Sequence, residues 1–361
     1  MRAGADVEES ADPESGAVDT PPEDTGVPRF SSFDVGADCI CGTTLDGTLR
    51  CSGLQPTERQ INDTYSELED WWVDHGQLDP PEGTWSEVSV SEGDWDPWGG
   101  SEAAADISDL QYGACAIGAD GDAACWGQPF DTPGEFPEWL EPPSEALTTA
   151  SMGFRHACGL TATGEVRCWG ACENGSCDAP SGSYVAIESG HDMSCALDAA
   201  GSIACWGLDP DIAADDAETL SESVADWGAN GPYVDILSMW NVVCGLLDDG
   251  TLRCHEYYVA TVSEWGPAAA GAKSVAIADS GQVITGVCWL DVAGSVTCGN
   301  DLAPDDQLPS SWPELRAHQL TTLASSGGEL CGLTTDNELV CASHWPENYP
   351  CPFCAAVYVD E

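Results

Sequence analysis

Short stretches in which apolar and polar residues alternate recur along the chain. Each ends in a small or turn-forming residue, as in Trp85–Val90, Tyr184–Ser189 and Leu320–Ala324. Because successive side chains of a β-strand point to opposite faces, this alternation predicts strands with one buried face. The sequence contains no run of 18 apolar residues, the length typical of a membrane-spanning helix. The pattern predicts an all-β protein.

One cysteine spacing recurs beside these stretches. Seven pairs enclose nine residues each: Cys41 and Cys51, Cys115 and Cys125, Cys158 and Cys168, Cys195 and Cys205, Cys244 and Cys254, Cys288 and Cys298, and Cys331 and Cys341. Seven recurrences of one spacing identify internal repeats. Because an alternating strand precedes most of the pairs, each repeat is a multi-stranded unit. Seven such units are typical of a seven-bladed β-propeller.

Each cysteine pair encloses the pattern of a β-hairpin. The seventh residue, counted from the first cysteine, is Gly in six repeats and Asn337 in the last. These residues tolerate a positive φ angle, which the third residue of a three-residue hairpin loop requires. With residues 162–164 as the loop, Cys158 lies opposite Cys168 in a non-hydrogen-bonded pair, whose side chains are close.

This register predicts a cross-strand disulfide in all seven hairpins. Each bridge would close a short loop and contribute about 2–3 kcal/mol to stability. One alternative is that the buried thiols pack without bonding. A second alternative is metal binding, although two opposed cysteines supply only half of a tetrahedral metal shell.

Two segments carry a resemblance to a known family. Phe154–Gly170 reads FRHACGLTATGEVRCWG, and Met193–Gly207 reads MSCALDAAGSIACWG. They resemble repeats of the regulator of chromosome condensation family, and most of all the short, cysteine-paired repeats of its secreted bacterial members. The resemblance covers residues 30–361 apart from insertions, and it implies a seven-bladed propeller. It implies little about function, since one fold hosts many activities.

The family includes a nuclear guanine-nucleotide exchange factor that binds chromatin, and a bacterial inhibitor of β-lactamases. The charge of this chain differs from that of the nuclear protein. Asp and Glu number 63 against 9 Lys and Arg, a formal net charge of −54, and Lys273 is the one lysine. Such a surface repels nucleic acid and anionic lipid, which bind proteins largely through Lys and Arg. We therefore expect no nucleic-acid partner, and we assign no exchange-factor residues.

The 19 cysteines indicate an oxidising compartment. We expect an extracellular or cell-surface location, with a signal or lipid-anchor segment that this sequence does not contain. Residues 1–29 are acidic and rich in Pro, Gly, Ser and Thr, which predicts a disordered spacer. The spacer would hold the propeller, residues 30–361, away from a surface to which it is tethered. We expect no direct insertion into the membrane.

Two insertions follow the first hairpin. Residues 54–82 are expected to be partly helical, because Thr57 and Gln60 form a capping box before apolar residues at helical spacing in 57–75. Residues 92–108 form an inserted loop. Tryptophans in loops can anchor a protein or sugar, so the candidate ligand contacts are Trp71, Trp95 and Trp98. The alternative for the loop tryptophans is that they cover the edge of a blade.

The remaining cysteines concern local bridges and closure of the ring. Cys172 and Cys177 flank a turn sequence, and we expect them to bond. Cys39 is expected to bond either Cys351 or Cys354, which leaves one thiol. The first blade would be completed either by residues 30–35 or by residues 355–361. Although Cys351 and Cys354 have redox-motif spacing, they lack the helical context that motif needs, so a structural role is expected.

No catalytic motif, cofactor site or metal site is predicted. The chain has no nucleophile elbow, phosphate loop or zinc-protease motif. His156 and His191 are expected to be structural. Two acidic clusters, residues 209–216 and 301–306, could hold Ca²⁺, but neither has the spacing of a known calcium loop. The alternative, a solvated acidic surface, is favoured.

We therefore expect a non-enzymatic, monomeric scaffold that binds a protein or glycan through propeller loops. Three other functions remain open. One is an enzyme inhibitor resembling the bacterial β-lactamase inhibitor. Another is a hydrolase or lyase with paired carboxylates in the central funnel. Exchange-factor activity, suggested by the family alone, ranks last because of the charge and the compartment.

Overall fold

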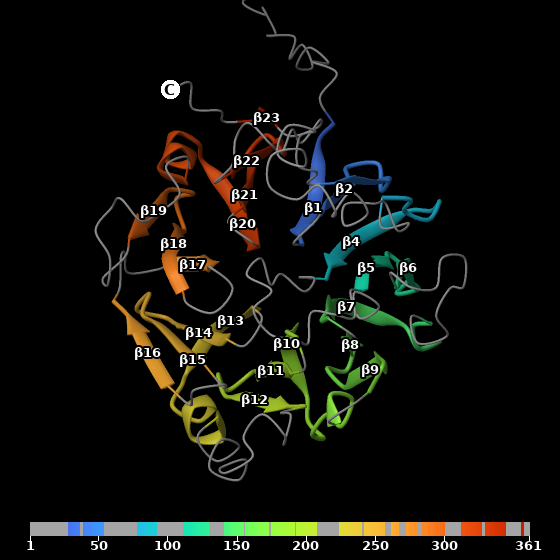
Figure 1. Ribbon diagram of the computed structural model, residues 1–361, viewed down its shortest axis with the longest axis horizontal. Helices are drawn as coiled ribbons and strands as arrows, with labels where there is room; N and C mark the ends of the chain where they lie inside the picture. Colours follow the sequence, from blue (N-terminus) through green and yellow to red (C-terminus); the bar gives the residue numbers. More distant parts are fainter. Residues whose placement is uncertain are drawn as a thin grey trace, which may run out of the picture.

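The protein is a ring of seven β-sheets around a central axis, and the first three strands of each sheet are antiparallel (Figure 1). The computed structural model describes residues 28–36, 39–53, 78–91, 111–129, 141–154, 156–172, 175–191, 193–207, 224–239, 242–256, 261–266, 272–279, 284–299, 312–326, 329–343 and 355–356. Numbered in chain order, the sheets are blades 1 to 7. This arrangement confirms the predicted seven-bladed β-propeller.

Each blade contains three consecutive strands, of which the first lies nearest the axis. The first strands are β1 (Phe30–Val35), β4 (Trp85–Val90), β7 (Leu147–Met152), β10 (Tyr184–Ser189), β13 (Tyr233–Met239), β17 (Ala272–Asp279) and β20 (Leu320–Ser326). The second strands are β2 (Cys39–Thr44), β5 (Gln111–Gly118), β8 (His156–Thr161), β11 (Ser194–Asp198), β14 (Val242–Leu247), β18 (Ile284–Asp291) and β21 (Glu329–Thr334). The third strands are β3 (Leu49–Gly53), β6 (Ala123–Pro129), β9 (Val166–Gly170), β12 (Ile203–Trp206), β15 (Leu252–Glu256), β19 (Val296–Gly299) and β22 (Leu339–Ser343).

The hydrophobic core lies between blades. Seven buried clusters fill the seven boundaries, and each combines residues from two neighbouring blades. The 3₁₀ helix η6 (Trp312–Ala317) adds Leu315 to the boundary of blades 6 and 7. A one-turn helix at 224–228 adds Val224 and Trp227 to the core between blades 4 and 5. Each first strand also contacts the first strands of both neighbours, which closes the ring.

All seven hairpins have the predicted loop. The third loop residue has a positive φ angle in every blade, between 79° and 88° at the glycines and 64° at Asn337. Each cysteine pair is joined by a disulfide with Cα atoms 4.0–4.1 Å apart. This separation is that of a non-hydrogen-bonded pair. Cys172 and Cys177 are also bonded to each other.

The hairpin turns connect neighbouring blades. The carbonyl of Gly164, in the turn of blade 3, accepts a hydrogen bond of 2.9 Å from the backbone N–H of Tyr184, the first residue of blade 4's first strand. The same bond follows the turns of blades 1, 2, 4, 6 and 7. At the boundary of blades 5 and 6, the Gly250 carbonyl accepts from the Trp289 indole at 3.1 Å. We call the side of the ring that carries these turns the hairpin face.

The first blade is completed by the N-terminal candidate strand. β1 pairs with β2, and the Phe30 N–H donates to the Asn337 carbonyl of blade 7 at 2.8 Å. The C-terminal candidate instead adds β23 (Ala355–Ala356) to the outer edge of blade 7, parallel to β22. The other fourth strand, β16 (Thr261–Trp265), extends blade 5. Blade 1 therefore receives its inner strand from the N-terminal side because β1 continues directly into β2.

Several predicted features lie outside the described residues. They include residues 1–27 of the spacer, the helix expected at 57–75, the loop at 92–108 and both acidic clusters. Cys39 is buried on β2, but Cys351 and Cys354 belong to the same undescribed set. The closure disulfide thus stays a prediction.

Candidate functional site

The two faces of the ring carry different connections. The hairpin face has the seven short turns. The segment with Trp95 and Trp98 joins the end of β4 to the start of β5, so it leaves and re-enters the ring at the opposite face. Trp71 falls in the connection between β3 and β4. The side chains of these three candidate contacts lie outside the described residues, so their role in binding stays a prediction.

A β-bulge near the start of the first strand presents one exposed residue per blade on the hairpin face. The register shifts there in every blade, because one residue is inserted between two pairs of the ladder. The seven equivalent exposed residues are Ser31, Ser86, Thr148, Val185, Val234, Lys273 and Thr321. We call these the bulge positions. They form a circle around the axis.

Hydroxyl groups at four bulge positions bond to their own blade. Ser86 donates to the Ile117 carbonyl at 2.8 Å, and Thr148 donates to the Leu160 carbonyl at 3.1 Å. Ser31 and Thr321 make the equivalent bonds in blades 1 and 7. Blades 4, 5 and 6 carry Val185, Val234 and Lys273 instead, and none of these side chains has a hydroxyl to donate. The ring therefore has one arc that differs chemically from the rest.

The residues of the inner rim also differ between blades, but they divide the ring differently from the bulge positions. In each blade, one residue of the first strand pairs with the first cysteine of the hairpin. In blades 1, 2 and 3 the side chain of this residue accepts a hydrogen bond from the next blade. Asp34 accepts from the Val90 N–H at 2.8 Å, Ser89 accepts from the Met152 N–H at 3.0 Å, and Ser151 accepts from the Ser189 N–H at 2.8 Å. In blades 5, 6 and 7 the position is Leu237, Ala276 and Ala324, whose side chains cannot accept a hydrogen bond.

Three carboxyl groups on these strands have raised pKa values. Burial raises the pKa of Asp34 to about 6, although hydrogen bonds from Val90, Val35 and Ser89 oppose the shift. Burial likewise raises the pKa of Asp235 to about 6. Burial, and to a smaller extent the charge of Asp34, raises the pKa of Glu87, against the effect of a hydrogen bond from Thr149. These carboxyl groups already accept bonds from the fold, so they serve as structural acceptors.

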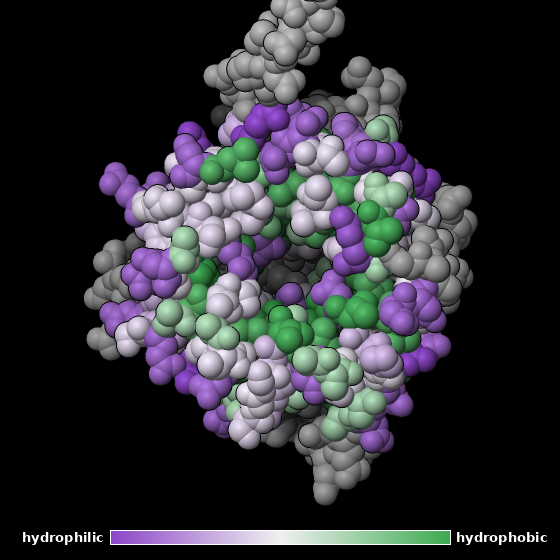
Figure 2. Space-filling model, turned by 180° about the vertical axis from the view of Figure 1, so that it is seen from behind, coloured by the Kyte–Doolittle hydropathy of each residue, from purple (hydrophilic) through white to green (hydrophobic). Residues whose placement is uncertain are grey.

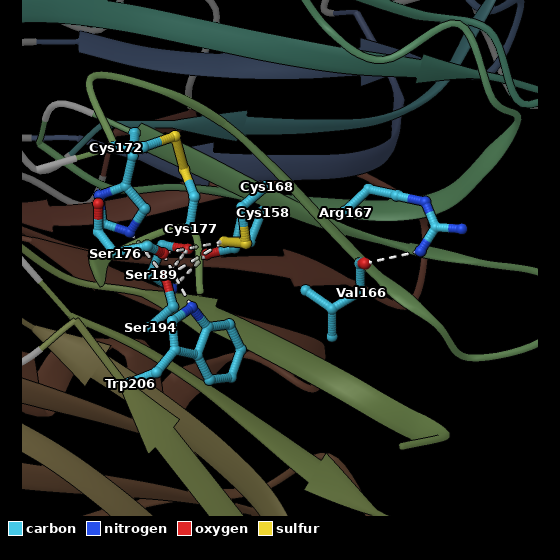
Figure 3. Close-up of a disulfide and its surroundings, with 12 residues drawn as sticks. Cys158, Val166, Arg167, Cys168, Cys172, Ser176, Cys177, Ser189, Ser194 and Trp206 are labelled. Atoms are coloured by element: carbon cyan, nitrogen blue, oxygen red, sulfur yellow. Dashed lines mark hydrogen bonds between the residues drawn. A yellow bond between two sulfur atoms is a disulfide. The ribbon is translucent and has the colours of Figure 1, made fainter. Parts of the chain in front are cut away.

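A serine–histidine contact at the boundary of blades 3 and 4 resembles part of a hydrolase site. His156 Nε2 lies 2.7 Å from Ser194 Oγ, which is 3.0 Å from Ser189 Oγ. Both Ser189 and Ser194 lie beside the Cys158–Cys168 disulfide and above Trp206 (Figure 3). Ser194 is fully buried and His156 is 1% exposed, so a substrate cannot reach the hydroxyl. The geometry matches the structural role expected for His156.

The described residues contain neither a metal-binding cluster nor a helix that could span a membrane. No group of three or more His, Cys, Asp or Glu side chains in this part of the chain could hold a metal ion. No helix among the described residues is long and apolar enough to cross a membrane. The face drawn in Figure 2 is hollowed at the centre, with apolar residues around the hollow and hydrophilic residues toward the outer rim.

Sequence reasoning missed the bulge positions and the bonds of the inner rim. Aligning the first strands at Phe30, Trp85, Leu147 and their equivalents would have shown that hydroxyl residues follow in four repeats. That alignment would not have shown which carbonyl accepts each bond, because the acceptor depends on how the ladder shifts at the bulge.

Comparison with known proteins supports the repeat and the fold. Residues 148–176, within blade 3 and the start of its following connection, match the family model of the Regulator of chromosome condensation (RCC1) repeat. No curated protein matches the sequence.

Among solved structures, the entire ectodomain of the Physcomitrella patens receptor kinase CR4 is 18% identical, with a TM-score of 0.50, over 86% of this chain and 72% of that one. Human WBSCR16 is 14% identical, with a TM-score of 0.47, over 73% and 77%. Prp20p from Saccharomyces cerevisiae is 13% identical, with a TM-score of 0.36, over 86% and 70%. At these identities the likeness concerns the fold alone. The ring of seven disulfide-linked hairpins shows that the chain is a seven-bladed β-propeller, and residues 148–176 within it are similar to the Regulator of chromosome condensation (RCC1) repeat.

Proposed function

We propose that the protein is an extracellular or cell-surface binding scaffold without catalytic activity, and that it recognises a protein or a glycan through its propeller loops. The observation that carries the proposal is the disulfide in every hairpin, each within or beside the core between blades. Disulfides persist in oxidising compartments, and a rigid scaffold lowers the entropic cost of presenting a binding surface.

The chemistry of the described residues supports a binding role more than a catalytic one. The buried serine–histidine contact is closed to substrate, and the rim carboxyl groups of Asp34 and Glu87 accept hydrogen bonds within the fold. No specific observation favours the hydrolase, the enzyme inhibitor or the exchange factor. A panel of hydrolase, β-lactamase-inhibition and guanine-nucleotide exchange assays on the full chain tests these alternatives directly.

The loop at residues 92–108, which connects the ends of β4 and β5 that lie away from the hairpin turns, is the proposed contact. A variant in which residues 92–104 are replaced by a Gly-Ser linker should fold, because β4 ends and β5 begins outside that segment. Immobilised full-length protein and this variant are each incubated with extracellular and cell-envelope material, and retained protein or glycan is identified. Retention by the full-length chain and loss by the variant are expected. Equal retention would remove the loop from the proposal, and no retention would contradict the binding role.

A further inference from the structure

We propose that the hairpin face of blades 4 to 6 is a second docking surface, and that its partner is an extended protein segment with aliphatic and basic side chains. This surface lies on the side of the ring opposite the end of β4 and the start of β5, between which residues 92–108 are inserted. Its function is therefore additional to the loop-mediated binding proposed above. It is defined by Val185, Val234, Lys273 and Val292, and we call it the valine arc.

The first evidence is the exposure of apolar side chains. Among the described residues, five large apolar side chains are more than half exposed, and four of them lie on the hairpin face: Leu45 at 58%, Val185 at 60%, Val234 at 51% and Val292 at 78%. Val185 and Val234 occupy the bulge positions of blades 4 and 5, and Val292 is the first turn residue of blade 6. Three consecutive blades thus each expose a valine on one face.

The fold does not require valine at these positions. A valine side chain that stays exposed contributes little hydrophobic stabilisation to the fold. It also lacks the hydroxyl that bonds to a carbonyl at the same position in blades 1, 2, 3 and 7. Threonine also suits a strand, has the same shape and would restore that bond. The valines therefore make sense as contacts for another molecule.

Charge decides which partner fits. Asp248 and Asp249 form the exposed turn of blade 5, and Asp198 and Asp291 precede the turns of blades 4 and 6. Arg253 of blade 5 is neutralised by Glu264, 2.7 Å away. Lys273 is then the arc's one cation, and it forms no ion pair with any described residue. Carboxylates around exposed valines match a segment with both basic and aliphatic side chains, whereas the charge of the chain repels an acidic segment.

The spacing of the blades suits an extended chain. Packed sheets lie about 10 Å apart, so neighbouring bulge positions have roughly that separation. Three residues of polyproline II conformation span about 9 Å and return a side chain to the same face. A segment with an aliphatic residue at every third position could therefore contact Val185 and Val234 in turn, with basic residues left to meet the turn carboxylates.

The test uses three synthetic peptides of about twelve residues, chosen to match this spacing. One has Leu at every third position and Lys and Ser between, one replaces Leu by Ser, and one replaces Lys by Glu. Their dissociation constants for the full chain are measured by calorimetry at physiological ionic strength, where attraction between exposed charges more than about 8 Å apart is largely screened and only close charge contacts contribute. The Leu/Lys peptide should bind at least about tenfold more tightly than either other peptide.

The variants locate the contact. V185T/V234T should weaken the Leu/Lys peptide by about tenfold, since threonine removes apolar area and keeps the shape. The matched control V262T changes a valine that is 52% exposed on β16, away from the hairpin face, and should change nothing. K273E should tighten the peptide several-fold by removing the one local positive charge.

The proposal fails if V185T/V234T binds like the unmodified chain, or if the Lys/Ser peptide binds as tightly as the Leu/Lys peptide, which would show charge attraction alone. Tighter binding of the Glu-containing peptide would also overturn it. Threonine occurs naturally at the same position in blades 3 and 7, so the double variant should fold, and the two single variants V185T and V234T provide a second measurement. Deletion of residues 92–104 should leave this binding unchanged, so the two proposals can fail separately.

Discussion

Blades 1 to 3 and blades 4 to 6 share the same three antiparallel strands, hairpin turn and hairpin disulfide, but they use the inner and bulge positions differently. In blades 1 to 3, Asp34, Ser89 and Ser151 connect each first strand to the next blade, and hydroxyl groups at the bulges bond within the blade. In blades 4 to 6, valines and a lysine occupy the bulge positions and remain exposed. A repeated module thus keeps its fold while one arc gives up the hydroxyl bonds of the bulge positions and presents apolar surface, and Ser325 of blade 7 still bonds to Ile277 of blade 6 at the inner rim.

The largest expected effect is the removal of a hairpin disulfide. C115A/C125A in blade 2 and C244A/C254A in blade 5 should each lower the free energy of unfolding by about 3 kcal/mol, because each bridge closes a short loop in the unfolded chain. The loss should be greater in blade 5, where Leu237 offers no side-chain bond to the next blade. Chemical denaturation measures both.

The control for this pair is C172S/C177S, which removes the bridge in the connection after blade 3 and should cost less. If the two double variants lost equal amounts of unfolding free energy, the hydrogen bonds of the inner rim would not contribute to the stability of the contacts between blades. A chain that unfolds identically with and without reductant would contradict the role of the bridges altogether.

A smaller effect is expected from the inner-rim serines. S89A and S151A should each cost about 1–2 kcal/mol, because each leaves a backbone N–H of the next blade without its acceptor. Ser183 offers a matched control, since its hydroxyl donates to the Thr163 carbonyl at an exposed site on the hairpin face. S183A should change stability by less than about 0.5 kcal/mol. If S89A and S151A were equally mild, hydrogen bonding would not distinguish the two arcs.

The smallest effect concerns pH and compares Asp34 with Asp235. Both pKa values are raised from 3.8 to about 6, so the folded protein binds these protons more tightly than the unfolded chain. Their favourable contribution is present at low pH and is lost as the pH rises from about 4 to 6. A pKa raised from 3.8 to about 6 corresponds to at most about 3 kcal/mol per ionised carboxyl at pH 7, of which an amide variant recovers only a part because it also weakens hydrogen bonds that the carboxylate accepts.

D235N should therefore stabilise the protein at pH 7 and leave it unchanged near pH 4, because among the described residues Asp235 accepts from the neighbouring Ile236 N–H alone. D34N should stabilise the protein less than D235N at pH 7. Asp34 accepts hydrogen bonds from the N–H groups of Val35 and of Val90 in the next blade, whereas an amide has only one oxygen to accept with. Melting temperatures recorded across this pH range measure both variants. Identical profiles for D34N and D235N would refute the difference between the arcs.

The hairpins could be predicted in detail, whereas the site could not. Gly164 and its equivalents specified the loop, and the loop set the register that places Cys158 opposite Cys168. The candidate contacts chosen from sequence, Trp71, Trp95 and Trp98, all fall in insertions without repeat partners. No internal comparison could therefore test them. The valines of blades 4 and 5 escaped notice because a single valine in an alternating strand is ordinary.

The sequence by itself determined the repeat number, the turn type and the cysteine pairing, because these depend on residues within about a dozen positions of one another. Only the tertiary structure decided which strand completes blade 1, which hydroxyl reaches the neighbouring blade and which arc remains apolar at the surface. Those outcomes join residues that are far apart in the chain, such as Asp34 and Val90. Their geometry follows from how whole blades pack around the axis, and no local pattern encodes that packing.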